Sequence, residues 1–337
     1  MPNISMKMLA KELQLSLSTV SKVFTDSHEI SEQTKQKVLA LAKQLNYVPN
    51  PYASSLRKRK SKTIAVVLPD VADSFFSVAI NGIESVARDK GYHVLIYLTH
   101  ELLDRERAIL SEFQSGRVDG VLISISNETT TDCHITDMMQ RGVPVVFFDR
   151  VCEETPTTRI TTNDRESGQL AAQHLIDAGC RNIAFLSISE SLPISRNRLA
   201  GCRQALSAQR LPFGADNVVM CTDDEAENVQ IIARLLQRPD RPDAIIASVE
   251  KLTAAVYLAC KQEKVSIPDQ LKVISFSNQN TAAILNPSLT TITQPAFNMG
   301  KMAAETLFTS LRKSHLPLKA ETLVVPSTLI VRESTGK

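Results

Sequence analysis

The chain lacks the sequence motifs of the common enzyme classes. No G-x-G-x-x-G, P-loop or G-x-S-x-G motif occurs in its 337 residues, and its Ser, His and Asp residues follow no recognised catalytic spacing. The six cysteines are scattered without a C-x-x-C pair, and the six histidines do not cluster. We therefore expect no enzyme activity, no metal, no cofactor, and reduced thiols instead of disulfides.

Long apolar runs are also missing. No window approaches 18 unbroken apolar residues, and the N-terminus does not show a basic segment followed by an apolar one. A secreted solute-binding protein would be expected to begin with such a signal. We expect a cytoplasmic protein that does not bind a membrane.

The first 48 residues predict a small all-α domain of three short helices. Ser5, Ser16 and Ser31 stand where N-caps are expected, and a tight turn at Gln14-Leu15 separates the first two helices. Each helix is too short to be stable alone, so the apolar faces should close one core. The residues expected in that core are Met6, Leu9, Ala10, Leu13, Val20, Val23, Phe24, Val38, Leu41, Ala42 and Leu45.

The second helix has the character of a DNA-reading helix. Its outward residues are small, hydroxylated or cationic, which suits phosphates and base edges in a major groove: Ser16, Leu17, Ser18, Thr19, Ser21 and Lys22. Residues 1–62 contain 11 Lys and Arg against 4 Asp and Glu, whereas the rest contains 27 against 32. The basic head should attract DNA and the acidic body should not.

Short motifs spread over almost the whole chain resemble the LacI/GalR family of transcriptional repressors. Those of the head are Leu9-Ala10, Leu15-Ser16, residues 18–23, 31–34, 45–50 and 53–56. Those of the body are Val118-Asp119-Gly120-Val121, Val143-Pro144-Val145-Val146, Arg198-Leu199-Ala200-Gly201 and residues 287–295.

The resemblance implies a hinge helix in residues 49–62, after the helix-turn-helix domain of residues 1–48. Such hinges fold on DNA as pairs and insert a leucine into the minor groove, and Leu56 matches that leucine. Ser54 replaces an Arg common among relatives, which removes one possible phosphate contact. The further DNA contacts that the resemblance implies are Ser5, Met6, Ser31, Thr34, Tyr47, Asn50 and Ala53.

From Thr63 the pattern changes to alternating strands and helices, which predicts an α/β fold with two doubly wound parallel-sheet lobes. Strands are expected at 63–68, 93–97, 121–125, 143–147, 183–187, 244–247 and 272–276, and helices at 76–89, 105–115, 168–178, 198–206, 226–236 and 252–262. The resemblance implies a periplasmic-binding-protein-like arrangement with three crossings, so that the lobes comprise residues 63–161 plus 293–323 and 162–292 plus 324–337.

Ligands of such sheets bind at the carboxyl ends of the strands, here in a cleft between the lobes. The resemblance places effector contacts at Phe75, Phe76, Asp149, Arg198, Val249, Ser277 and Gln294. Sugar-responsive relatives commonly have Asn or Asp where this chain has Val249 and Ser277, so the pocket should accept an anion better than a hexose pocket would. An ion pair between Asp149 and Arg150 is the alternative to a ligand role for these two residues.

We therefore predict a dimeric repressor that binds a palindromic operator in double-stranded DNA. Its effector remains open among a sugar or sugar derivative, an anionic metabolite, and no small molecule at all. The chain shows no heptad pattern after Val331, which favours a homodimer over a tetramer. The alternative function is a cytoplasmic solute-binding protein without a regulatory role.

Overall fold

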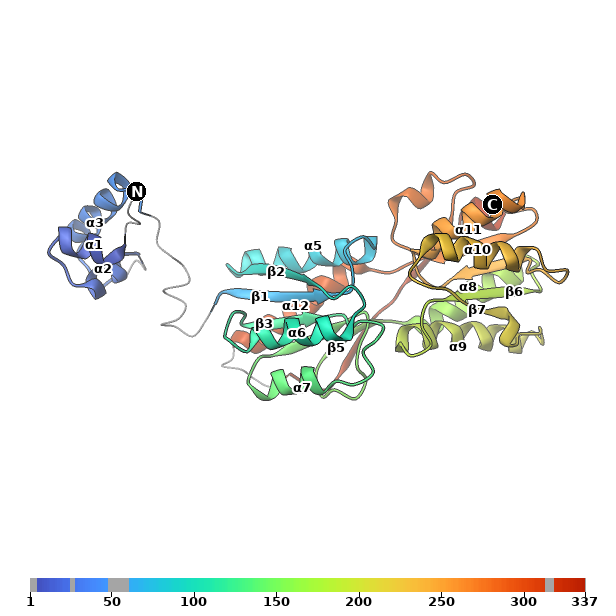
Figure 1. Cartoon of the computed structure of the whole chain (residues 1–337), viewed down its shortest axis with the longest axis horizontal. Helices are drawn as coiled ribbons and strands as arrows, with labels where there is room; N and C mark the ends of the chain where they lie inside the picture. The colour runs from blue at the N-terminus through green and yellow to red at the C-terminus, as the bar shows by residue number, and fades with distance from the viewer. Residues whose placement is uncertain (1–4, 25–27, 48–60, 313–317, 337) are drawn as a thin grey trace. The chain divides into compact units, whose positions relative to one another are not determined.

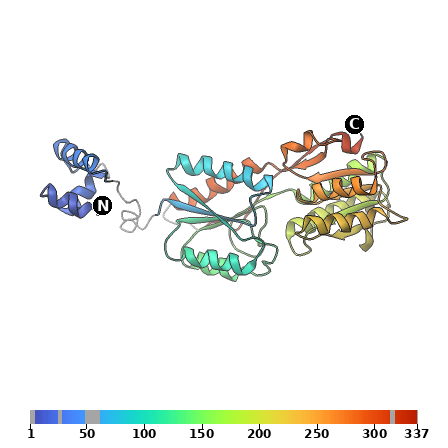
Figure 2. The same ribbon diagram turned by 45° about the horizontal axis from the view of Figure 1, so that its top comes forward.

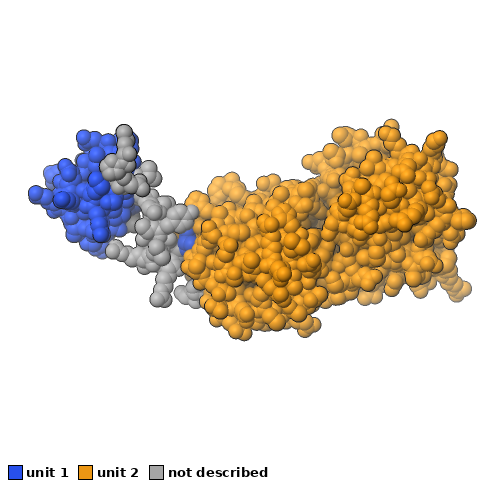
Figure 3. Space-filling view, viewed as in Figure 1, with its two compact units in different colours: residues 1–61 blue, residues 62–337 orange. Residues whose placement is uncertain are grey.

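The computed structural model describes residues 5–24, 28–47, 61–312 and 318–336. The chain divides into two compact units, residues 1–61 and 62–337, which Figure 3 shows in separate colours. The predicted hinge helix, with Asn50, Ala53 and Leu56, lies outside the described residues.

The first unit contains the three predicted helices, α1 (Met6–Glu12), α2 (Leu17–Phe24) and α3 (Glu32–Gln44). Their apolar faces close one core around the buried Leu9, Val20 and Val38, as predicted. Gln14 has a φ of 53°, and the Leu15 amide donates to the Ala10 carbonyl, which makes the tight turn between α1 and α2.

Two of the three predicted N-caps form. The Ser16 hydroxyl accepts from the Thr19 amide at 3.0 Å, and the Ser31 hydroxyl accepts from the Thr34 amide at 3.4 Å. Ser5 occupies the N-cap position of α1, but its side chain makes no capping hydrogen bond, so that prediction was wrong. The Met8 amide instead donates to the Ser5 carbonyl at 2.9 Å.

The second unit is built on two six-stranded sheets, in agreement with the predicted fold class (Figure 1). The first has the order β11-β5-β4-β3-β1-β2 and is wholly parallel. Its strands are β1 (Thr63–Leu68), β2 (His93–Leu98), β3 (Gly120–Ile123), β4 (Val145–Phe148), β5 (Arg159–Thr162) and β11 (Thr322–Val325).

The second sheet has the order β12-β10-β9-β8-β6-β7, and only the β10–β12 pair is antiparallel. Its strands are β6 (Ile183–Ser187), β7 (Val218–Met220), β8 (Ala244–Ala247), β9 (Lys272–Phe276), β10 (Thr290–Thr293) and β12 (Thr328–Ile330). The short 3-10 helices are η1 (Ala215–Asn217), η2 (Asn280–Ala283) and η3 (Glu333–Thr335).

Helices cover both faces of each sheet, as Figure 2 shows. On the first sheet, α5 (Ser74–Asp89) and α12 (Ala296–Arg312) pack on one face, and α6 (Leu103–Phe113) and α7 (Cys133–Gln140) on the other. On the second, α8 (Asp164–Asp177) and α9 (Pro193–Ala208) oppose α10 (Glu225–Leu236) and α11 (Leu252–Glu263). Both faces of the central strands are therefore buried, which explains their continuous apolar runs.

Several elements differ from the sequence prediction. Helix α9 begins five residues before the predicted start at Arg198, because Pro193 stands at its first turn, where proline is preferred. Helix α8 begins at Asp164 instead of Gly168. The pattern also missed α7, α12 and the strands β5, β7, β10, β11 and β12. These strands have only three or four residues each, too few for a clear period.

The chain passes between the two sheets three times: between Thr162 and Asp164, between Thr293 and Ala296, and between Val325 and Thr328. Each crossing lies slightly later than the expected lobe boundaries at 161/162, 292/293 and 323/324, because β5, β10 and β11 keep their pairing to their last residues. The first and third crossing segments are joined, since the Ser327 amide donates to Asn163 Oδ1 at 2.8 Å.

Candidate functional site

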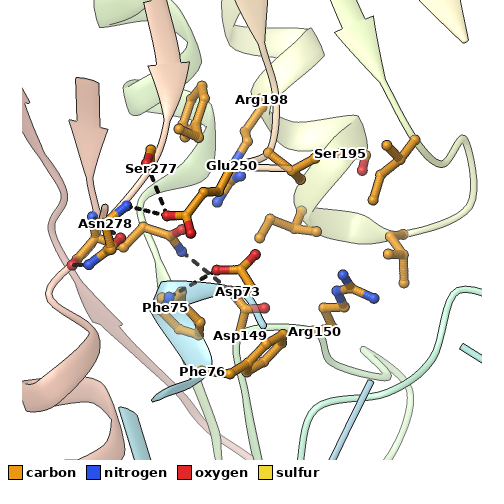
Figure 4. A pocket seen from close by; sticks show the side chains of 16 residues that line it. Asp73, Phe75, Phe76, Asp149, Arg150, Ser195, Arg198, Glu250, Ser277 and Asn278 are labelled. Atoms are coloured by element: carbon orange, nitrogen blue, oxygen red, sulfur yellow. Dashed lines mark hydrogen bonds between the residues drawn. The ribbon is translucent and has the colours of Figure 1, made fainter. Parts of the chain in front are cut away.

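A pocket lies between the two lobes, where strands of both sheets end (Figure 4). All seven predicted effector residues line it: Phe75, Phe76, Asp149, Arg198, Val249, Ser277 and Gln294. Nine others complete the wall: Asp73, Arg150, Ile188, Leu192, Ile194, Ser195, Glu250, Phe276 and Asn278. The topology thus brings together residues from six segments of the sequence; whether they bind an effector remains a prediction.

Phe75 and Phe76 form the aromatic side of the pocket at the start of α5. Their ring centroids are 5.3 Å apart in an edge-to-face arrangement, and Phe76 makes a second edge-to-face contact with Phe148. Both side chains are almost fully buried and belong to the core between α5 and the sheet. This packing fixes their position before any ligand arrives.

Asp149 occupies the first position after β4, with a φ of 62°. Gln294, in the second crossing segment, donates through Nε2 to Asp149 Oδ1 at 3.3 Å, which joins the two predicted residues directly. Burial raises the pKa of the Asp149 carboxyl, although Arg150 and Arg198 oppose the shift.

The alternative ion pair between Asp149 and Arg150 does not form. The Arg150 guanidinium instead contacts both oxygens of Glu101, each at 2.9 Å. Asp149 and Arg150 lie in a bend after β4, and the positive φ of Asp149 turns the backbone there. Arg150 also lies over the Phe76 ring, 6.0 Å from its centroid.

Arg198 is the most deeply buried cation of the pocket, with a side chain that is 2% exposed. Its Nε donates to Asp164 Oδ1 at 2.8 Å, its Nη1 donates to the Ser248 carbonyl at 2.6 Å, and the guanidinium stacks on Phe276. The remaining nitrogen, Nη2, is buried with no hydrogen-bond partner among the described residues. Arg198 can therefore donate one more hydrogen bond within the pocket wall.

Glu250 is a pocket residue that the sequence prediction missed. Its buried carboxylate accepts from the Ser74 amide at 2.9 Å and hydroxyl at 2.5 Å, the Ser277 hydroxyl at 2.9 Å, and the Asn278 amide at 2.8 Å. The sequence did contain a signal for this residue. Glu250 follows the apolar strand at residues 244–247 by three positions, and the carboxyl ends of parallel strands are where ligand-binding side chains lie.

Asp73 is the second missed carboxylate. It caps α5 through a hydrogen bond from the Phe75 amide to Oδ1 at 2.9 Å. Burial, together with the nearby Glu250, raises the pKa of Asp73 to about 6. The pocket thus has one group whose charge changes just below neutral pH.

The carboxylates correct the expectation that the pocket favours an anion. That reasoning counted Arg198 as an available charge, but Asp164 neutralises it, as Glu101 neutralises Arg150. Asp73, Asp149 and Glu250 form no ion pair with a cation in the described part of the chain. A neutral ligand rich in hydroxyl groups suits this balance better than an anion does.

The predicted DNA contacts of the head are exposed or half-buried in the first unit. The Ser16 hydroxyl lies 2.7 Å from that of Ser18 and 2.8 Å from that of Thr19, so these three residues form one cluster at the start of α2. Lys22 forms an ion pair with Glu29, and the Tyr47 ring packs on Phe24. Leu17 is 39% exposed, so its side chain is accessible to an apolar partner.

In the described parts of the chain, no group of His, Cys, Asp and Glu side chains could hold a metal ion, and no helix is long and apolar enough to cross a membrane.

Comparison with known proteins agrees with the family resemblance for both units. Residues 5–50 match the profile of the bacterial regulatory proteins of the lacI family, and residues 172–335 match that of the periplasmic binding protein-like domain. The ribose operon repressor of Haemophilus influenzae is 30% identical over 98% of both chains. The HTH-type transcriptional repressor PurR of Photobacterium profundum is 31% identical over 92% of this chain and 93% of its own.

The fold is also found among solved structures. The lac repressor dimer bound to operator and the anti-inducer ONPF superposes with a TM-score of 0.85 over 98% of this chain and 99% of that one, at 22% identity. Together with the three-helix head and the two-lobed body, these similarities show that the chain belongs to the LacI family of bacterial regulatory proteins.

Proposed function

We propose that the protein is a transcriptional repressor that binds a palindromic operator as a homodimer and is controlled by a small neutral ligand between its lobes. The observation that carries this proposal is the combination of a basic helix-turn-helix head with a polar pocket between two sheets in one chain. A solute-binding protein would have no use for the head. Because the proposed target is DNA, we expect the protein in the cytoplasm.

The N-terminal part of α2 is the segment that we expect to enter the major groove. Ser16, Ser18 and Thr19 gather their hydroxyls there, next to the partial positive charge of the helix end. Leu17 offers an apolar contact to a thymine methyl, and Lys22 can exchange Glu29 for a phosphate or a guanine. Ser5, Met6, Ser31, Thr34 and Tyr47 would support this helix through backbone contacts.

A homodimer is supported by apolar side chains that the second unit leaves exposed. Leu95 and Ile96 are 37% and 45% exposed on β2, which is an edge strand of the first sheet. Leu258 on α11 is 45% exposed, and Ile284 next to η2 is 81% exposed. A second copy of the chain would cover such faces, and relatives of this fold include the lac repressor dimer.

A sugar is the ligand class that best fits the pocket chemistry. Carboxylate and amide oxygens of Asp73, Asp149 and Gln294 can accept from hydroxyls, and Arg198 Nη2 can donate to one. Two related structures contain sugars, a CelR–cellobiose complex and an Enterococcus faecium regulator with bound ribose. Ligand binding would change the balance between lobe arrangements, and through it the spacing of the two hinges in the dimer.

The test is selection of bound duplexes from a random DNA pool by the purified full-length protein. We expect a palindrome with a flexible pyrimidine–purine step at its centre. Lys22→Ala should relax the preference at one base position in each half-site, whereas Lys43→Ala, an equal loss of charge on α3, should weaken binding to all sequences alike. Failure to enrich any sequence, with or without a metabolite extract, would contradict the proposal.

A further inference from the structure

Glu250 connects the two lobes of the second unit. It lies between β8 and α11 of the C-terminal lobe, but two of its four hydrogen bonds come from Ser74, at the start of α5 in the N-terminal lobe. The other two come from Ser277 and Asn278, which follow β9 in its own lobe, and Figure 4 shows them converging on the carboxylate. One anionic group thus uses polar donors from both sides of the pocket.

The same side chain lines two cavities. The inner one, lined by Arg198, Phe276 and Gln294 among others, has a volume of about 30 Å³, which accommodates about one water molecule. The outer one, lined by His100, Asp223 and Lys251 among others, has a volume of about 320 Å³. Glu250 lines both cavities, together with Asp73, Phe76 and Arg150.

We propose that Glu250 acts as an internal ligand of the pocket: its carboxylate fastens the two lobes together, and an effector has to compete with it for the donors of Ser74, Ser277 and Asn278. This inference rests on the proposed function only in calling the pocket an effector site.

The donors explain why this competition is possible. The hydroxyls of Ser74 and Ser277 and the Asn278 amide point to Oε2, and the Ser74 amide points to Oε1, so a ligand with two neighbouring acceptor oxygens can satisfy them. A hydroxylated ligand that takes this position releases Glu250 toward the outer cavity, where Gln279 can receive it and where Lys251 would exchange its present partner Asp223 for it. A ligand must therefore form hydrogen bonds strong enough to offset those that Glu250 loses. A ligand that is a weak acceptor cannot displace Glu250 and cannot open the inner cavity.

The test measures the distance between the lobes in the full-length protein by pulsed electron paramagnetic resonance. Cys133 on α7 is the exposed cysteine, whereas four others are buried and burial raises the pKa of Cys152 to about 12, so one spin label can be directed to Cys133. Ser207→Cys provides the second site on an exposed turn of α9. Labelled protein is mixed with excess unlabelled protein, so that each dimer holds at most one labelled protomer.

We expect one short distance between the two labels when Glu250 is present, and a longer, broader distribution of this distance in Glu250→Ala. The ratio of short to long distances should fall roughly tenfold or more, as expected for the loss of charge-assisted hydrogen bonds across a closure. Acetate matches the group that this substitution removes and should restore the short distance, whereas chloride at equal ionic strength should not. Glu225→Ala, which removes an exposed carboxylate from α10, is the control and should leave the distance unchanged.

An unchanged distance in Glu250→Ala, a long distance in the unmodified pocket, or an opening that acetate does not reverse would each overturn the proposal. If Glu250→Ala does not fold, Glu250→Gln and Ser74→Ala preserve the packing and weaken the same contacts, so both should show a smaller opening. Operator binding is measured separately, so a protein that binds no DNA but shows this behaviour would refute the proposed function and leave the internal ligand in place.

Discussion

Replacing Arg198 with methionine should strongly destabilise the C-terminal lobe. The side chains of Arg198 and Asp164 are 2% and 6% exposed, and their Nε and Oδ1 atoms are 2.8 Å apart. Removal of one partner from such a pair leaves an uncompensated buried charge, at a cost of about 3–5 kcal/mol. That is a large part of the 5–15 kcal/mol or so by which domains are usually stable.

The cost should depend on pH in a defined direction. Burial already raises the pKa of Asp164, and Arg198 opposes that shift, so loss of the arginine should raise the pKa further. The folded variant then binds a proton that the unfolded chain releases. The free energy of unfolding of Arg198→Met, relative to the parent protein, should therefore increase as pH falls from 7 toward 5.

A double-mutant cycle measures the pair itself. The variants are Arg198→Met, Asp164→Leu and their combination, and urea unfolding is followed by far-ultraviolet circular dichroism, because the chain has no tryptophan. The double variant should be much more stable than the sum of the single effects predicts, since no buried charge remains unpaired. A loss of less than about 1 kcal/mol in Arg198→Met, or additive effects in the double variant, would refute this reasoning.

Four other predictions concern the cap, the helix packing, the pocket acid and the hinge. Ser31→Ala should destabilise the head by about 1 kcal/mol in thermal melts whereas Ser5→Ala should not, because only Ser31 makes a capping bond; equal effects would contradict this. Gly168→Ala should destabilise the protein in urea titrations by several times the ordinary effect, on the order of 3 kcal/mol, because its Cβ would lie 2.0 Å from the Arg198 carbonyl oxygen, and a neutral result would show that α8 can shift away from α9. In the parent protein the free energy of unfolding should fall by on the order of 2 kcal/mol as pH rises from 4 to about 6, because the folded state holds the Asp73 proton more tightly than the unfolded chain does. Asp73→Asn should remove this fall, and identical pH profiles for the two proteins would exclude Asp73 as its source. Leu56→Ala should weaken binding to the selected operator far more than to random DNA in titrations by fluorescence anisotropy, and equal losses would exclude a wedge in the minor groove.

The head illustrates what a local pattern can predict. Apolar spacing, a serine before each helix and a short polar turn gave the three helices and the core residues, since each of these signals acts within a few residues. The failure of the Ser5 cap shows the limit of such reasoning. A cap is a hydrogen bond with a definite geometry, and the residue type alone does not ensure it.

The pocket illustrates what a resemblance adds and what it leaves out. All seven residues carried over from the family line one pocket, although they are spread from Phe75 to Gln294. Position along the family pattern could not tell which charges are already paired. The partner of Arg198 lies 34 positions away and that of Arg150 lies 49 away, so local sequence carries no sign of either pair.

The sequence by itself determined the class of the protein: the periods of 3.6 and 2 give its helices and strands, the charge distribution separates a basic head from an acidic body, and the ordered motifs place it in a family. The tertiary structure decided the electrostatic balance of the pocket and the role of Glu250. Both depend on distances between residues such as Ser74 and Glu250, which are 176 positions apart and meet only because the chain crosses from the first sheet to the second.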